Sequence, residues 1–239
     1  MNSTFPFQVP NRALFSYTKE IKRGILIMPF IVVDAGHGGR DNGAQGFGYK
    51  EKDINLRVSQ AVSQRLRKLG FQVTELRSDD TDIGNAGARG KEIARLQPDF
   101  AISIHCNSSD GTGKFQGAEI YVPLAKHVAR FEYNLRDRLQ HLTKFRHISS
   151  KESKTQLLYE RQIDPNTLTF TNTYYDKTDF YGIIREARKG GVNCDIIEMF
   201  YLDNEEDLYT FLNQESAYVE AMVYAMCKAF DMLYIPPGG

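Results

Sequence analysis

The chain has 239 residues, and its 30 Lys and Arg residues balance its 30 Asp and Glu residues. This length suits one large α/β domain. The even balance excludes an overall positive field that would draw the protein to nucleic acid or acidic lipid. The three cysteines, an odd number at unhelpful spacings, indicate neither a disulfide framework nor a cysteine-rich zinc site, and the two in predicted strands are interpreted as small core residues. They are Cys106, Cys194 and Cys227.

Residues 1–27 are interpreted as an N-terminal extension of the domain or as upstream sequence. The apolar stretch at residues 24–33 follows three basic residues, a pattern that resembles a signal peptide. Because the stretch continues into the first predicted strand, cleavage after it would remove part of the fold, and we expect no signal peptide. The stretch is also shorter than the roughly 20 apolar residues of a membrane span.

Apolar runs and helical periodicities alternate from residue 28 onwards. The run Phe30-Ile31-Val32-Val33 predicts a short buried strand, and apolar residues spaced by three and four from Ile54 to Leu69 predict a helix that ends at Gly70. This order predicts one α/β domain, residues 28–235, with an open, mainly parallel twisted sheet and helices on both faces. The later elements are predicted as a strand at 71–76, a helix ending at Pro98, strands at 100–104 and 117–122, a helix at 125–142, a strand at 192–197 and a helix at 216–233.

The first strand leads into the glycine-rich loop "DAGHGGRDNGAQGFG", which carries His37. A dinucleotide-binding loop would need glycine where Asp41 stands, and a Walker loop would need Ser or Thr where Glu92 follows Gly90-Lys91. The loop therefore suits a metal ligand or a general base, although a surface turn with an incidental histidine is the structural alternative. We expect its glycines to let a metal ion and a bulky substrate approach the backbone.

Ligands of parallel α/β sheets gather beyond the carboxyl ends of the strands. His37 follows the first strand, His105 ends "AISIHCN", Glu198 ends "CDIIEMF", and Glu51 lies near the start of the first helix. Two imidazoles and one carboxylate make a common zinc set with an open fourth position, and a further carboxylate can transfer the proton of a water molecule. Glu198 suits that second task, and a salt-bridged carboxylate at a helix cap is the structural alternative.

Three motifs together, "DAGHGGRDNGAQGFGYKEKDINL", "SIHCNSS" and "IIEMFYLDNEEDL", resemble in order and spacing the zinc-dependent N-acetylmuramoyl-L-alanine amidases of the third amidase family. The resemblance implies that His37, Glu51 and His105 bind zinc and that Glu198 is the catalytic glutamate. It also implies that the substrate is bacterial peptidoglycan, cut between the muramoyl lactyl group and L-alanine. Arg89 is a plausible counterpart of an arginine usual in that family.

The segment 146–181 looks longer than the family's usual sequence, and we interpret it as an inserted hairpin or loop. Its aromatic residues could line a substrate groove, or one of its carboxylates could cover the zinc. A surface excursion with edge-strand aromatics explains them equally well. The aromatic residues are Tyr159, Phe170, Tyr174, Tyr175 and Tyr181, and the histidines expected to be solvated are His127, His141 and His147.

Other functions stay open at this point. Another zinc amidohydrolase or peptidase would share the fold and the metal, whereas a pure peptidoglycan-binding module would not need Glu198. If Glu198 proved to be a fourth ligand, Glu119 would be the next candidate for the base. The closing "IPPGG" resembles the start of a linker to a wall-binding domain. A phage endolysin or a sporulation autolysin fits a chain that is cytoplasmic until lysis, or that reaches the wall by an unrecognised route.

Overall fold

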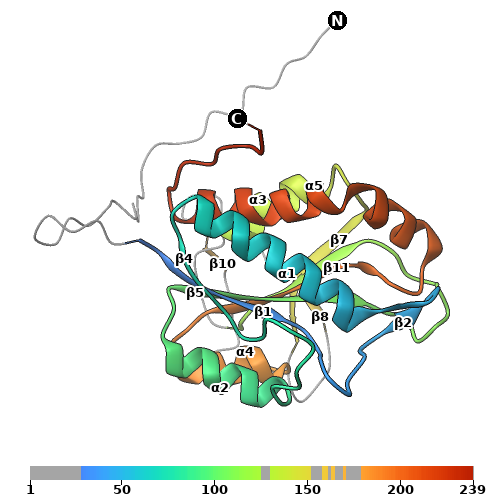
Figure 1. Ribbon diagram of the computed structural model, residues 1–239, viewed down its shortest axis with the longest axis horizontal. Coiled ribbons are helices and arrows are strands. Elements are labelled where there is room, and N and C mark those ends of the chain that lie inside the picture. The colour runs from blue at the N-terminus through green and yellow to red at the C-terminus, as the bar shows by residue number, and fades with distance from the viewer. Residues whose placement is uncertain are drawn as a thin grey trace, which may run out of the picture.

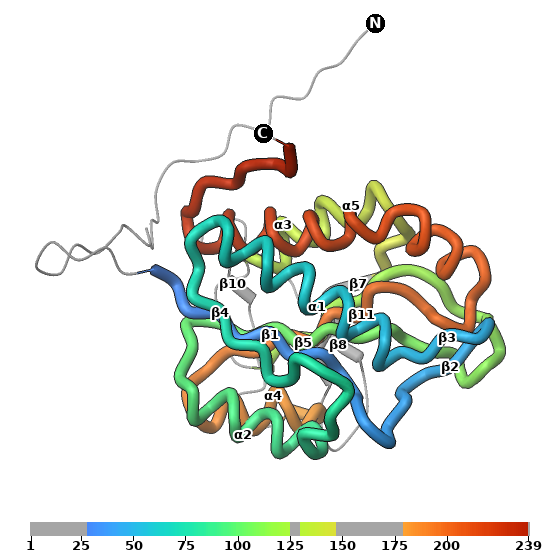
Figure 2. The backbone as a smooth tube through the Cα atoms, in the orientation of Figure 1, coloured from blue at the N-terminus to red at the C-terminus, as the bar shows by residue number. Residues whose placement is uncertain are grey.

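The computed structural model describes residues 28–124, 130–151, 158–160, 163–164, 169–170 and 179–238. A seven-stranded sheet lies at its centre, in the order β4-β1-β5-β11-β6-β7-β8 (Figures 1 and 2). In that order its strands are Gln72–Glu75, Phe30–Ala35, Phe100–Asn107, Cys194–Tyr201, Ala118–Tyr121, Phe145–Lys151 and Leu158–Glu160. Two small antiparallel pairs join β2 (Gln45–Gly46) to β3 (Tyr49–Lys50) and β9 (Ile163–Asp164) to β10 (Thr169–Phe170).

The sheet is mainly parallel, as the sequence predicts. β4, β1, β5 and β11 run parallel to one another, while β6 is antiparallel to β11 and β8 is antiparallel to β7. The central strands are continuous apolar runs because both of their faces are covered. Ile31, Ile102 and Ile197 are all fully buried.

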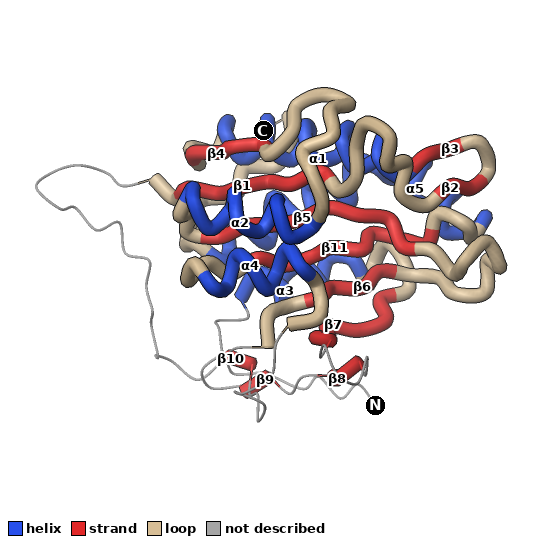
Figure 3. Tube along the Cα trace, turned by 90° about the horizontal axis from the view of Figure 1, so that it is seen from below, coloured by secondary structure: helices blue, strands red, loops and turns tan. Residues whose placement is uncertain are grey.

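Five helices in the described ranges cover the two faces of the sheet, which confirms the predicted layers (Figures 1 and 3). One face packs against α1 (Glu51–Lys68), α3 (Arg130–Leu139) and α5 (Glu205–Ala229). The opposite face packs against α2 (Ala86–Leu96) and α4 (Gly182–Lys189). None of the helices in the described part of the chain is both long enough and apolar enough to cross a membrane.

The last helix begins earlier than the predicted start at residue 216. α5 starts at Glu205 because the side chain of Asn204 accepts a hydrogen bond from the backbone of Asp207, which caps the helix. The acidic first turn also suits the positive end of the helix dipole. Gln214 has non-helical angles (φ −132°, ψ 20°) that kink the helix. The predicted start therefore corresponds to the part of α5 after the kink.

Several predictions fall wholly or partly outside the described residues. The extension 1–27, His127, Tyr174 and Tyr175 lie outside them, and the predicted helix 125–142 is described only from Arg130. The segment 146–181 contributes β7 to β10, and its contact with substrate stays a prediction. Tyr159 lies in β8, Phe170 in β10 and His147 in β7, while His141 is exposed. All three cysteines are free and buried.

The loop between β5 and β6 is held by one carboxylate from the loop before α5. Asp203 accepts hydrogen bonds from the backbone of Ser109, Gly111 and Gly113 and from the hydroxyl of Ser109, at 2.8 to 3.3 Å. Asn204 adds a bond from its side-chain amide to the carbonyl of Gly113 at 2.9 Å. Burial alone would raise the pKa of Asp203, but the hydrogen bonds from Ser109 and the two glycines hold it below its usual value.

We expect Asp203→Asn to lower the free energy of unfolding by about 2 kcal/mol at neutral pH, because the hydrogen bonds to a charged acceptor weaken. A lowered pKa stabilises the fold above the unfolded value of about 3.9, and this stabilisation is lost as the pH falls through the folded value. The deficit should therefore shrink towards about pH 3. Urea unfolding at both pH values tests this, with the exposed Asp110→Asn as the control. A deficit that does not change with pH would contradict it.

Candidate functional site

The loop after β1 passes close to the end of β5. The backbone N–H of Gly36 donates to the carbonyl of Ile104 at 3.0 Å, and a Cβ on Gly36 would lie 2.2 Å from the ring of His105. Gly43 has φ +65°, and a Cβ there would lie 2.4 Å from the carboxylate of Glu51. These two glycines make room for the side chains of the site itself, and the approach of a metal ion and a substrate to the loop stays a prediction.

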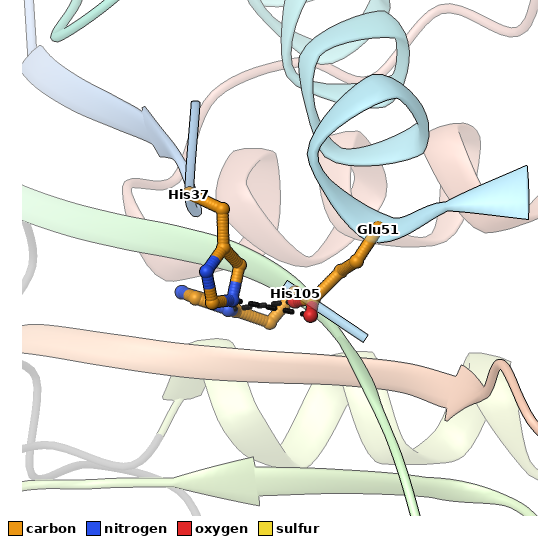
Figure 4. A group of neighbouring side chains, drawn as sticks. All are labelled: His37, Glu51 and His105. Carbon is orange, nitrogen blue, oxygen red and sulfur yellow. Dashed lines mark hydrogen bonds and ion pairs between the residues drawn. The ribbon is translucent and has the colours of Figure 1, made fainter. Parts of the chain in front are cut away.

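Three of the predicted site residues converge beyond the carboxyl ends of β1 and β5 (Figure 4). Glu51, at the start of α1, lies with one oxygen 3.1 Å from Nε2 of His37 and the other 2.9 Å from Nδ1 of His105. One ligand atom from each residue lies within 4.8 Å of the others. Two nitrogens and one carboxylate oxygen at this spacing could hold a metal ion.

The carboxylate of Glu51 dominates the electrostatics of this cluster. Burial alone would raise its pKa, but hydrogen bonds and charge interactions with His105 and His37 lower it well below its usual value. Burial likewise opposes the charged imidazoles, but the carboxylates of Glu51 and Asp41 together outweigh burial and raise the pKa of His37 to about 9. The pKa of His105 is raised for the same reason. The negative charge of Glu51 therefore favours the positively charged form of both histidines. A divalent cation between these side chains would supply positive charge at the same place.

Asp41 orients the ring of His37. Its carboxylate lies 2.8 Å from Nδ1 of His37 and also accepts a hydrogen bond from the backbone of Gly43 at 3.0 Å. With Nδ1 occupied, Nε2 is the nitrogen that faces Glu51. A carboxylate on the far nitrogen of a metal-binding histidine fixes the ring and raises its basicity.

Two buried arginines hold the carbonyls of the loop that carries His37. Arg89 of α2 pairs with the buried Asp34 at 2.7 Å and donates to the carbonyls of Ala35 and His37. Arg77, after β4, donates to Ala35 at 2.9 Å and to the carbonyl of Gly36 at 3.0 Å. Arg89 therefore positions the loop. Sequence reasoning missed Arg77, although its place just after a strand was the available signal.

Glu198 lies on β11, in register with His105 on one side and Glu119 on the other. Its Oε2 is buried and has no hydrogen-bond partner among the described residues. Burial raises the pKa of Glu198 to about 7, although the positive charge of His105 opposes the shift. A carboxyl group that exchanges its proton near neutral pH suits general acid-base chemistry.

Glu119 is placed differently, although it lies beside Glu198. Its oxygens accept hydrogen bonds from the hydroxyl groups of Tyr121 and Tyr201, at 2.7 and 2.9 Å, and from Asn107 at 3.2 Å. Nε of Arg146 lies 2.9 Å from Oε1 of Glu119. These partners occupy the oxygens, so Glu119 suits a structural role better than that of a base.

Of the five aromatic residues singled out in the segment 146–181, Tyr181 is the one whose side chain lies among the described residues. It precedes α4, and the centre of its ring is 4.9 Å from that of Tyr121. Burial, and then the charges around it, raise the pKa of Tyr181 above its usual value, with Glu198 among those charges. Tyr181 therefore lies close to the neighbouring strand positions of Glu198 and Glu119.

The family profile described as N-acetylmuramoyl-L-alanine amidase matches residues 31–231. The chain belongs to this family. Among curated proteins of Bacillus subtilis (strain 168), it is 43% identical over 91 residues to the uncharacterized protein YqiI and 36% identical over 91 residues to the N-acetylmuramoyl-L-alanine amidase LytC. These matches cover 38% of this chain in both cases, but 43% of YqiI and 18% of LytC. The chain thus spans less than half the length of either relative.

Solved structures of amidases share the fold. The catalytic domain of the amidase CwlV from Bacillus (Paenibacillus) polymyxa var. colistinus superposes with a TM-score of 0.62 at 21% identity, covering 86% of this chain and 100% of that one. An amidase from Clostridium difficile 630 gives a TM-score of 0.65 at 20% identity, covering 85% and 97%. The amidase family and the predicted fold are both confirmed.

We expect Asp41→Ala to weaken the binding of a divalent metal ion by about 10- to 100-fold, the usual effect of losing such a carboxylate partner. His37 keeps its place on the loop, but its ring loses the acceptor on Nδ1. Competition with a chromophoric chelator measures the affinity, and Asp53→Ala, an exposed acidic residue in the first turn of α1, is the matched control. Equal affinities in the two variants would contradict the role of Asp41.

Proposed function

We propose that this protein is a peptidoglycan hydrolase that cuts the amide bond between the lactyl group of N-acetylmuramic acid and L-alanine of the stem peptide. The observation that supports this proposal is the convergence of His37, Glu51 and His105 beside Glu198, which has one buried carboxylate oxygen, in a member of the amidase family. Relatives include a germination-specific N-acetylmuramoyl-L-alanine amidase of Bacillus subtilis and an endolysin of Bacillus phage SPP1. Such an activity would place the protein at the cell wall when it acts.

We further propose that His37, Glu51 and His105 hold one zinc ion. The donor set fits, because catalytic zinc sites use imidazole nitrogens and carboxylate oxygens as three protein ligands. When bound, zinc would polarise the substrate carbonyl and lower the pKa of a bound water molecule to about 7.

The side chains of this chain would then divide the remaining work. Glu198 would take one proton from the attacking water and deliver it to the nitrogen of the departing L-alanine as the C–N bond breaks. The second proton of the water also ends on that nitrogen, so that the peptide leaves as an ammonium ion and the lactyl group leaves as a carboxylate. Asp41 keeps the ring of His37 oriented, and Arg89 keeps the loop beneath it in place.

Digestion of purified cell walls tests the reaction. We expect new amino-terminal alanine and no new reducing sugar ends, because the proposed cut is at an amide and leaves the glycan intact. Removal of zinc by a chelator should abolish the release, and added zinc should restore it. New amino termini other than alanine would indicate a peptidase on the same fold, and no release at all would contradict a hydrolase.

We expect Glu198→Gln to keep the metal but to lower the rate of alanine release by at least about 10²-fold, because an amide cannot accept the proton. His105→Ala should lose the metal as well as the activity. Zinc content and rate are measured together for both variants. Loss of zinc from Glu198→Gln would make Glu198 a ligand, and an unchanged rate would remove it from the mechanism.

A further inference from the structure

A cationic and aromatic surface lies beside Glu119, the residue opposite Glu198 on β6. We call it the Arg146 surface and define it by Lys114, Phe115 and Arg146. The guanidinium of Arg146 lies 4.8 Å from the centre of the Phe115 ring, and the Lys114 ammonium lies 5.7 Å from it. Phe115 is 41% exposed, and the side chain of Arg146 is 34% exposed.

The Arg146 surface is joined to the candidate site through Glu119. The oxygen of Glu119 that meets Nε of Arg146 also accepts from Tyr201. Glu119 stands directly opposite Glu198 across the pair formed by β6 and β11. Neighbouring strands are about 4.8 Å apart, and β7, which carries Arg146, is two strands from β11, so the side chain of Arg146 reaches Glu119 on the strand between them.

Arg146 keeps binding capacity for a ligand. A guanidinium has five N–H donors in a planar fork, and the oxygens of Glu119 are shared with Tyr121 and Tyr201. Glu119 cannot engage the whole fork, and a third of the side chain is open to solvent. Lys114 adds a positive charge that no ion pair neutralises among the described residues. Because Glu119 offsets only one of the positive charges of Arg146 and Lys114, the surface keeps one net positive charge.

The loop that presents Lys114 and Phe115 is fixed before any ligand arrives. Asp203 binds the backbone of Ser109, Gly111 and Gly113 on one side of the pair. On the other side, Asp207 accepts from the backbone of Gly117 at 2.7 Å. A surface held in this way loses little conformational entropy when a ligand binds.

We propose that the Arg146 surface binds a free carboxylate of the stem peptide, that of the D-glutamyl residue after L-alanine, with Arg146 and Lys114 as its partners. This assignment rests on the proposed function. One residue of chain spans at most about 3.6 Å, so a carboxylate one residue beyond the cleaved amide lies within about one strand spacing of it, and Arg146 extends towards that place from β7 as far as Glu119 on β6. Arginine forks match carboxylates in two hydrogen bonds, and the guanidinium of Arg146 lies over the ring of Phe115.

The test uses two ligands that differ only at that group: N-acetylmuramoyl-L-alanyl-γ-D-glutamyl-L-lysine and its counterpart with the α-carboxylate amidated. Binding is measured by calorimetry on zinc-loaded Glu198→Gln protein, so that no turnover is needed. We expect the carboxylate ligand to bind about tenfold more tightly, a typical effect of a charge-assisted hydrogen bond. Equal binding of the two ligands, or no binding of either, would overturn the proposal.

The preference should fall to about unity when Arg146→Lys and Lys114→Gln are added, since the first removes the fork and the second the extra charge. Matched controls come from α3 and α5, where Arg138 and Lys228 lie 3.8 and 5.4 Å from the ring of Tyr224. Arg138→Lys and Lys228→Gln should leave the preference unchanged. A preference that survives in the Arg146 and Lys114 variants would place the carboxylate elsewhere.

Alanine release from cell walls by the otherwise unchanged protein separates this proposal from the proposed function. If walls yield new amino-terminal alanine while the two ligands bind equally, only the Arg146 surface is wrong. If the ligands bind with the expected preference and walls yield no alanine, the assigned reaction is wrong and the carboxylate site stands.

Discussion

A buried carboxylate, that of Glu51, joins the three parts of the structure that make the site. An ionised group out of water is costly unless its oxygens are fully hydrogen-bonded. Here it is satisfied from the glycine-rich loop, from α1 itself and from β5. Besides the two imidazoles, its partners are the backbone N–H of Ala44, the amide of Asn55 and the backbone N–H of Cys106. The loop, the helix and the strand are therefore fixed relative to one another by the same two oxygens.

The loop needs a second kind of support because it turns sharply after β1. His37 itself has φ 62°, a conformation that costs free energy for a residue with a side chain. The strain is offset by Arg77 and Arg89, whose guanidinium groups engage the consecutive carbonyls of the turn. Asp34, deep in the sheet, neutralises Arg89. The position of the imidazole thus depends on charges in the interior behind it.

The sequence predicts the layers of the fold, because the spacing of apolar residues distinguishes helices from strands. It also predicts which four polar residues come together, because the carboxyl ends of parallel strands meet at one edge of the sheet. His105 and Glu198 each stand at the end of an apolar run, where a polar residue is conspicuous. Arg77 follows β4 at the same edge of the sheet and could have been found this way, but the role of Glu119 could not, because it depends on which strands become neighbours. The start of α5 was missed because Asn204 caps a turn whose apolar pattern is interrupted at Gln214.

The alternation of side chains along β11 limits where residues can be inserted or deleted in this chain. Ile197 and Met199 point to the face covered by α1, α3 and α5, and Glu198, between them, points to the other. Side chains alternate along a strand, so one residue gained or lost between Cys194 and Ile197 would send Glu198 into the apolar layer and expose an isoleucine beside His105. A change of length by one residue is therefore unfavourable between Cys194 and Ile197, whereas the turn before Cys194 can take one without moving Glu198 to the other face.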